Sequence, residues 1–167
     1  MSENILELFR PIKNLIFDVD GVLATEHLLV TEEGHLLRQM NSKDGFALKT
    51  ALDKGYTIII ITGGASMGVA KRLWGLGIEQ VHYGIHNKQS KYNELQQQFN
   101  LKKEETLYMG DDMVDFEVMQ LVGLPCCPAN AVSEIQQISK YISPFNGGYG
   151  CVRDVIEKVL KLNNQWY

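Results

Sequence analysis

The sequence predicts an α/β fold in three layers, with helices on both faces of a central parallel sheet. Two observations predict this fold. Short apolar runs alternate along the chain with segments of helical periodicity, and the run 57–61, Thr-Ile-Ile-Ile-Ile, is apolar on both faces, as strands of parallel sheets are. A chain of 167 residues can bury a substantial core. Because the sequence holds no linker-like stretch and no internal repeat, we expect one domain, 1–167.

The first part of the chain carries a strand, a hairpin, a helix and a second strand. In order we expect an amphipathic turn within 1–10, a strand ending at Asp18, a β-hairpin at about 27–40, a helix from Asp44 to Gly55 and the strand 57–61. Apolar residues flank Thr31-Glu32-Glu33-Gly34 on both sides, which predicts a small projecting hairpin with a glycine in its loop. Two strands alone bury little surface. We therefore expect another surface to cover this hairpin.

The second part repeats the alternation of helix and strand. In order we expect a helix from about Ser66 to Trp74, a strand near 81–83, a helix to about Phe99, the strand 106–109, a helix through 116–121, a strand to Cys127, a helix over roughly 131–138, a short strand at 141–142 and a terminal helix from about Val152. The terminal helix has the clearest pattern, because Val152, Val155, Ile156 and Val159 share one helical face.

Composition narrows the functional classes. The net charge is −4 and no basic stripe runs along the sequence, which argues against a nucleic-acid partner. The longest apolar runs are too short to span a bilayer, and residues 1–14 are charged where a signal peptide has its apolar core. Three cysteines form neither a disulfide framework nor a zinc pattern. We expect a cytoplasmic protein with buried thiols.

Two carboxylates follow the first strand. In Phe17-Asp18-Val19-Asp20-Gly21 the aspartates are two residues apart, so an extended chain sends both to the same side. Carboxylates held that close repel each other, and a cation relieves the repulsion. Oxygen ligands of this kind suit Mg²⁺.

Further polar side chains are expected at the same edge of the sheet. Ligands bind beyond the carboxyl ends of parallel strands, and the residues at those ends are Asp18, Asp20, Thr62, Gly63, Lys88, Asp111, Asp112 and Asp115. Taken alone, such a threonine or Asp-Asp pair is often a helix cap and such a lysine a solvated charge. Together they match phosphoryl transfer, which needs a nucleophile, an acid/base, donors for phosphate oxygens and carboxylates for Mg²⁺.

The sequence Asp18-Val19-Asp20-Gly21-Val22 resembles the first motif of the haloacid dehalogenase-like (HAD) hydrolases, and Thr62, Lys88 and the segment 110–115 resemble the other three. The resemblance implies a HAD sandwich in which Asp18 is the nucleophile that becomes an aspartyl-phosphate and Asp20 is the acid/base. It further implies that Thr62, Gly63 and Lys88 hold the phosphate. Mg²⁺ would be bound by Asp18, the Asp20 carbonyl and Asp111. The residues around these ligands would be Asp112 and Asp115, which orient Lys88 or the water on the metal.

The segments between the motifs leave no room for a cap domain. Within the HAD hydrolases, the chain resembles a small, capless branch that carries a hairpin. This branch is that of the 3-deoxy-D-manno-octulosonate 8-phosphate phosphatases and their nononate 9-phosphate relatives. The chain matches this branch further at 41–45 and 147–153. The resemblance implies a homotetramer, a sugar phosphate substrate and a place in lipopolysaccharide biosynthesis. The chain departs from this branch at Glu26-His27 and at Gly64. Both positions lie near the expected sugar site, so a nononate 9-phosphate or acylneuraminate 9-phosphate stays an alternative substrate.

Two other functional classes compete with a phosphatase. A phospho-receiver signalling domain also has a small parallel sheet, an acidic Mg²⁺ pocket, a threonine and a lysine, but in a different order along the chain. It has no need of Asp20. A catalytically silent binding subunit is disfavoured because every position with a chemical role is filled. Phosphate release with and without Mg²⁺ separates an enzyme from both.

Overall fold

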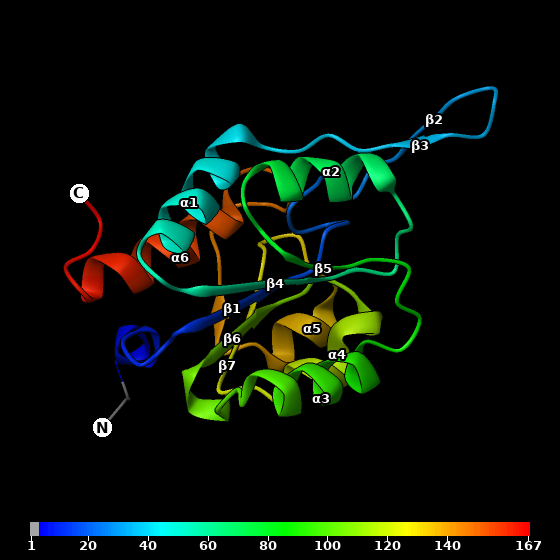
Figure 1. Cartoon of the computed structure of the whole chain (residues 1–167). Helices are drawn as coiled ribbons and strands as arrows, with labels where there is room; N and C mark the ends of the chain where they lie inside the picture. Colours follow the sequence, from blue (N-terminus) through cyan, green and yellow to red (C-terminus); the bar gives the residue numbers. More distant parts are fainter. Residues whose placement is uncertain (1–3) are drawn as a thin grey trace.

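The computed structural model describes residues 4–167, in which strands and helices alternate along the chain (Figure 1). The strands are β1 (Asn14–Phe17), β2 (Leu29–Val30), β3 (Leu36–Leu37), β4 (Thr57–Ile61), β5 (Gln80–His82), β6 (Thr106–Met109), β7 (Leu124–Cys127) and β8 (Tyr141–Ile142). The helices are α1 (Ser42–Asp53), α2 (Met67–Gly75), α3 (Lys88–Phe99), α4 (Phe116–Met119), α5 (Ser133–Ile138) and α6 (Cys151–Leu162), with 3-10 turns η1 (Ile5–Phe9), η2 (Lys103–Glu105) and η3 (Met113–Asp115).

The central sheet has six strands in the order β5-β4-β1-β6-β7-β8, and every neighbouring pair is parallel. Strand β1 lies between β4 and β6, with Phe17 opposite Ile60 on one side and Met109 on the other. All four residues of β1 are buried, as expected for a strand covered on both faces. The predicted parallel α/β sandwich is confirmed.

Helices cover both faces of this sheet, α1, α2 and α6 on one and α3, α4 and α5 on the other (Figure 1). Strand alternation divides the core accordingly. Leu15 and Phe17 join the apolar cluster under α1, α2 and α6, whereas Ile16 and Tyr108 join the cluster over α3, α4 and α5. Because the helices occupy both faces, the carboxyl edge of the sheet stays open for a ligand.

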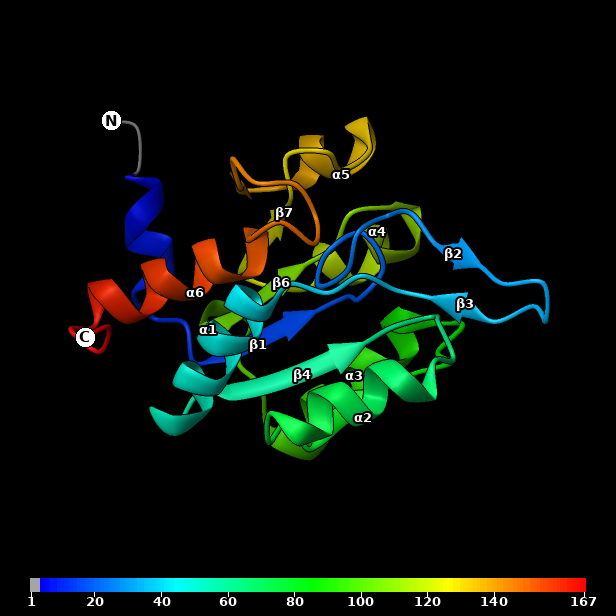
Figure 2. The same cartoon turned by 90° about the horizontal axis from the view of Figure 1, so that it is seen from above.

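A small antiparallel hairpin projects away from the sheet (Figure 2). Leu29 pairs with Leu37 and Val30 with Leu36, and Gly34 takes a φ of +82° in the loop between them. The arms are shorter than the expected range of about 27–40, since only two residues on each side pair. Their apolar side chains are exposed, with Leu29 at 66% and Val30 at 63%.

Some element bounds differ from those expected. Helix α1 begins at Ser42 rather than Asp44, because the Asn41 side chain accepts a hydrogen bond from the Lys43 N–H and caps the helix there. The helix expected through 116–121 ends at Met119 and follows the 3-10 turn η3. The turn expected within 1–10 is the 3-10 helix η1, and residues 1–3 lie outside the described residues.

All three cysteines are buried, as expected. Cys126 and Cys127 lie on β7 and Cys151 is the first residue of α6. Among the described residues, no helix combines the length and apolar character needed to cross a membrane.

Candidate active site

The predicted site residues meet at the carboxyl edge of the sheet. Asp18 follows β1, Thr62 follows β4 and Asp111 follows β6, so three adjacent strands deliver them to one place. Lys88 is the first residue of α3, where the Asn87 side chain caps the helix. A cavity of about 250 Å³ lies between them, lined by Asp18, Asp20, Gly21, Glu26, Thr62, Gly63, Gly64, Lys88, Asp111, Asp112 and Val114.

Lys88 lies at the centre of a buried ionic cluster. Its side chain is 2% exposed, and Nζ is 2.7 Å from Asp18 Oδ2 and 2.7 Å from Asp115 Oδ1. Burial acts to lower the pKa of Lys88, but the two carboxylates outweigh burial and raise it. The side chain is therefore a fixed ammonium that can face an anion in the cavity.

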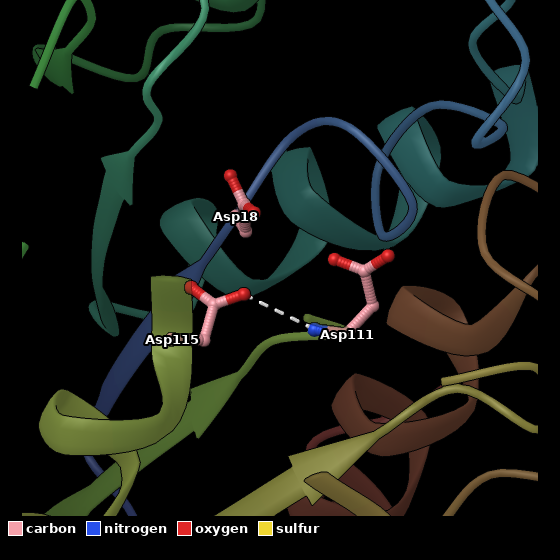
Figure 3. Close-up of side chains that lie close together, drawn as sticks. All are labelled: Asp18, Asp111 and Asp115. Atoms are coloured by element: carbon pink, nitrogen blue, oxygen red, sulfur yellow. Dashed lines mark hydrogen bonds between the residues drawn. The ribbon is translucent and has the colours of Figure 1, made fainter. Parts of the chain in front are cut away.

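Asp115 is fully engaged by the protein. Its Oδ1 accepts hydrogen bonds from Lys88 Nζ and from the Tyr108 hydroxyl, each at 2.7 Å. Its Oδ2 accepts the backbone N–H of Asp111 at 3.1 Å, the dashed contact in Figure 3. Tyr108 was not recognised as a contributor from sequence, because it lies in an apolar strand run. Asp115 therefore orients both Lys88 and the segment that carries Asp111.

Burial and the negative charge of Asp115 raise the pKa values of the other two carboxyl groups, Asp18 and Asp111. The pKa of Asp18 rises to about 8, first because of burial and then because of the charge of Asp115, although Lys88 opposes the shift. The pKa of Asp111 rises to about 7, again from burial first and then from Asp115. A cation placed between them would relieve the repulsion and favour the ionised forms.

These residues fit a magnesium ion. Asp18, Asp111 and Asp115 each have a carboxylate oxygen within 4.8 Å of the others (Figure 3), and oxygen donors suit Mg²⁺. Both oxygens of Asp115 accept hydrogen bonds, and those of Asp18 face the Val19 N–H at 2.6 Å and Lys88 Nζ at 2.7 Å. Of the three carboxylates, only that of Asp111 accepts no hydrogen bond from the described residues, so its oxygens are the most available to a metal. Gly21, with a φ of +78°, lies against Asp111, and a Cβ on Gly21 would meet Asp111 Oδ2 at 1.8 Å. The loop after β1 therefore requires glycine at this position.

The remaining predicted residues line the same cavity. Thr62 is 3% exposed, and its Oγ1 accepts the Gly64 N–H at 3.3 Å. Asp112 accepts the Met113 N–H at 2.7 Å, as a cap of η3. Glu26 reaches the cavity wall, where Asn130 Nδ2 donates to its Oε2 at 3.0 Å.

A second contact at the site, besides that of Tyr108 with Asp115, was missed by the sequence analysis. Asp20 pairs with Arg38, which follows β3 in the hairpin, with Nε 3.0 Å from Oδ1 and Nη2 3.2 Å from Oδ2. The sequence around Arg38 does not indicate this contact, because the pair forms only when the hairpin folds back beside the loop after β1.

Comparison with known proteins agrees with this geometry. Residues 81–156 match the family model of the haloacid dehalogenase-like hydrolases. The 3-deoxy-D-manno-octulosonate 8-phosphate phosphatase of Escherichia coli K12 is 32% identical over 160 residues, which cover 96% of this chain and 85% of that protein. The chain belongs to the haloacid dehalogenase-like hydrolase family. The predicted resemblance is therefore confirmed, and with it the enzyme class, a HAD-type phosphatase.

Solved structures of HAD phosphatases share the whole fold. The 3-deoxy-D-manno-octulosonate 8-phosphate phosphatase of Yersinia pestis superposes with a TM-score of 0.93 at 28% identity, over 99% of this chain and 89% of that one. The enzyme of Moraxella catarrhalis, crystallised with magnesium, phosphate and KDO, gives 0.93 at 29% identity, over 99% and 95%. The cobalt-bound Haemophilus influenzae enzyme gives 0.89 at 26% identity, over 94% and 92%.

Proposed function

We propose that this HAD phosphatase is a Mg²⁺-dependent phosphomonoesterase for a phosphorylated 2-keto-3-deoxy sugar acid similar to 3-deoxy-D-manno-octulosonate 8-phosphate. One observation carries the chemistry: Asp18, at the end of the central strand, lies 2.7 Å from a buried lysine inside an acidic cavity. The substrate class rests on the named relatives, one of which was crystallised with magnesium, phosphate and KDO.

Asp18 is the nucleophile in this proposal. Its carboxylate attacks phosphorus, the bond from phosphorus to the sugar oxygen breaks, and an aspartyl-phosphate forms on Asp18. Asp20 gives a proton to the departing sugar oxygen. Asp20 then takes a proton from the water that attacks phosphorus, which releases phosphate and restores Asp18.

Lys88, the Thr62 hydroxyl and the Gly63 backbone N–H hold the phosphate oxygens. The Lys88 ammonium is fixed before substrate arrives, because Asp115 and Asp18 hold it on two sides. A donor fixed in advance stabilises developing charge without having to reorganise during the reaction.

The metal would be held by the carboxylates of Asp18 and Asp111 and the backbone carbonyl of Asp20. Bound Mg²⁺ supplies charge neutralisation to the phosphate, which otherwise repels the attacking carboxylate. Asp115 acts from behind by orienting Lys88 and the Asp111 N–H. Asp112, which also lines the cavity, would orient water around the metal.

We further propose a cytoplasmic homotetramer. Leu28, Leu29, Val30, Leu36 and Leu37 are between 39% and 66% exposed on the hairpin, and exposed apolar patches of this kind mark interfaces. A capless site also needs water excluded from around the sugar phosphate. A neighbouring subunit's hairpin can provide that closure. Three free buried thiols suit a reducing compartment.

A phosphate-release screen tests the proposal. The purified protein is assayed with 3-deoxy-octulosonate 8-phosphate, nononate and acylneuraminate 9-phosphates and simple hexose phosphates, each with Mg²⁺ and with EDTA. We expect Mg²⁺-dependent release with the octulosonate ester giving the highest kcat/KM. The Asp18→Asn variant is the matched inactive control. A higher kcat/KM for a 9-phosphate would move the assignment to that substrate, since Glu26, where the chain departs from the octulosonate branch, lines the cavity. Activity that survives exhaustive chelation would contradict the proposed metal dependence.

A further inference from the structure

Arg38 holds the proposed acid/base residue through both of its carboxylate oxygens. Arg38 Nε lies 3.0 Å from Asp20 Oδ1 and Nη2 lies 3.2 Å from Oδ2. Paired, two-point contacts of this kind fix the plane of a carboxylate as well as its position. The Arg38 side chain is 7% exposed and that of Asp20 is 35% exposed, so the guanidinium is almost wholly buried, and Asp20 is the member of the pair that lines the cavity. This is more than an incidental surface ion pair.

The guanidinium occupies a site that the surrounding chain leaves for it. Its third nitrogen, Nη1, donates to the Leu36 carbonyl oxygen at 2.8 Å. On the other side, a Cβ on Gly64 would lie 2.9 Å from Arg38 Nη2 and 3.1 Å from Asp20 Oδ2. Any side chain at position 64 would therefore press on both members of the pair. The glycine after Thr62-Gly63 leaves the space in which they meet.

The backbone next to Arg38 is tied to the loop that carries Asp20. The Thr25 N–H donates to the Gln39 carbonyl at 3.2 Å, and Ala24 forms an antiparallel bridge with Met40. Ala24 also bridges to Asp20 itself. The hairpin's return arm and the loop after β1 are therefore joined through the backbone, and the Arg38 side chain adds its contact with Asp20.

We propose that Arg38 is the positioning residue for Asp20: it fixes the plane of the carboxyl group so that the oxygen carrying the proton directs its O–H toward the leaving oxygen of the substrate. This inference rests on the proposed function, in which the proton on Asp20 passes to the bridging oxygen as the bond from phosphorus to oxygen breaks. Arg38 acts through Asp20, and the hairpin thereby contributes to chemistry in its own subunit.

The dependence of rate on the leaving group tests this role. A sugar phosphate loses an alkoxide that needs a proton, whereas 4-nitrophenyl phosphate loses a stable phenolate that does not. The value of kcat/KM reports the steps up to departure of that group. In Arg38→Ala we expect kcat/KM for the sugar phosphate to fall about 10²-fold, the size of a general-acid contribution. For the aryl ester we expect a loss of less than about tenfold.

Two further arms separate positioning from a structural role. Guanidinium ion added to Arg38→Ala should restore part of the sugar phosphate activity, because it can fill the vacated site, and should do little for the aryl ester. Arg38→Lys keeps the charge but loses the two-point contact, so its selective loss should be intermediate. Arg10→Ala is the matched control, since Arg10 pairs with Glu7 on the surface and its side chain is 52% exposed. It should behave as wild type on both substrates.

Each outcome bears on the inference. Equal losses on the two esters would overturn it, because they would mean that Arg38 binds the phosphate or only supports the fold. If Arg38→Ala does not fold, as judged by circular dichroism, Arg38→Lys decides, and an unchanged ratio of the two kcat/KM values overturns the inference. A wild-type protein that hydrolyses neither ester would instead refute the proposed function.

Discussion

Replacing Lys88 with methionine should strongly destabilise the metal-free protein. The substitution keeps the length of the apolar stem and removes the charge, which leaves Asp18 and Asp115 buried without their shared partner. Both contacts are 2.7 Å long, and the exposed fractions of the side chains are 2% for Lys88, 6% for Asp18 and 0% for Asp115. Removing one member of a buried ion pair lowers stability by about 3–5 kcal/mol. We therefore expect a loss of at least about 3 kcal/mol in the free energy of unfolding.

The loss should depend on pH in a defined direction. Because its pKa is raised, Lys88 contributes its full stabilisation at pH 7.5, and that contribution is lost only as the pH rises through the raised value. In Lys88→Met the two carboxyl groups can be neutralised only by protons. The difference from wild type should therefore shrink as the pH falls from 8 to 5.

Urea unfolding in EDTA, followed by circular dichroism, measures this difference. Lys91→Met is the matched control, because Lys91 lies on the same helix and pairs with Glu94 at the same 2.7 Å, but with exposed fractions of 22% and 61%. Such a pair contributes about 0.5 kcal/mol or less. A Lys88→Met loss no greater than that of the control would refute the view that the buried cluster is held by this ammonium.

Four other outcomes are expected. Asp18→Asn should abolish phosphate release while leaving the circular dichroism spectrum unchanged; activity within about tenfold of wild type, or about 1.4 kcal/mol in barrier, would remove Asp18 as nucleophile. The pKa of Asp18 is raised to about 8 and that of Asp111 to about 7, so both carboxyl groups are protonated at pH 6. Because Mg²⁺ binds the ionised carboxylates, the increase in Tm that Mg²⁺ causes should grow with pH up to about pH 8.5. An increase in Tm that does not depend on pH would argue against these two ligands. Burial raises the pKa of Asp44 to about 6 from 3.8, so the free energy of unfolding should fall by up to about 3 kcal/mol as the pH rises from about 4 to 6, and Asp44→Asn should remove that slope in urea titrations. Deleting 28–37 should give smaller species in light scattering that still bind Mg²⁺ but hydrolyse the sugar phosphate poorly, whereas a fully active wild-type monomer would contradict the role of the hairpin.

The sequence predicted those parts of the site whose positions follow from local pattern and topology. The strand 57–61 is apolar on both faces, so its burial and its end at Thr62 could be read directly. Once parallel strands were expected, Asp18, Thr62 and Asp111 had to share one edge of the sheet. These residues do line one cavity.

Contacts between side chains distant in sequence could not be predicted in the same way. Asp44, expected to open a helix, lies inside α1, where its Oδ1 accepts the Arg153 N–H of α6 at 2.8 Å. Arg38 reaches Asp20 only because the hairpin returns beside the loop after β1. Neither contact leaves a periodic or compositional signal, because each depends on how two separately formed elements pack.

The reactivity of the buried cysteines can be used to measure how often parts of the fold open. Burial raises the pKa of the Cys126, Cys127 and Cys151 thiols, so little reactive thiolate is present in the closed fold. A thiol reagent therefore reacts only when a region opens, and its rate gives the population of that opened form. Cys126 and Cys127 report on β7, whereas Cys151, whose Sγ lies 3.3 Å from the Val22 carbonyl oxygen, reports on the contact between α6 and the loop after β1. Labelling followed by peptide mass spectrometry would resolve these two regions without any engineered probe.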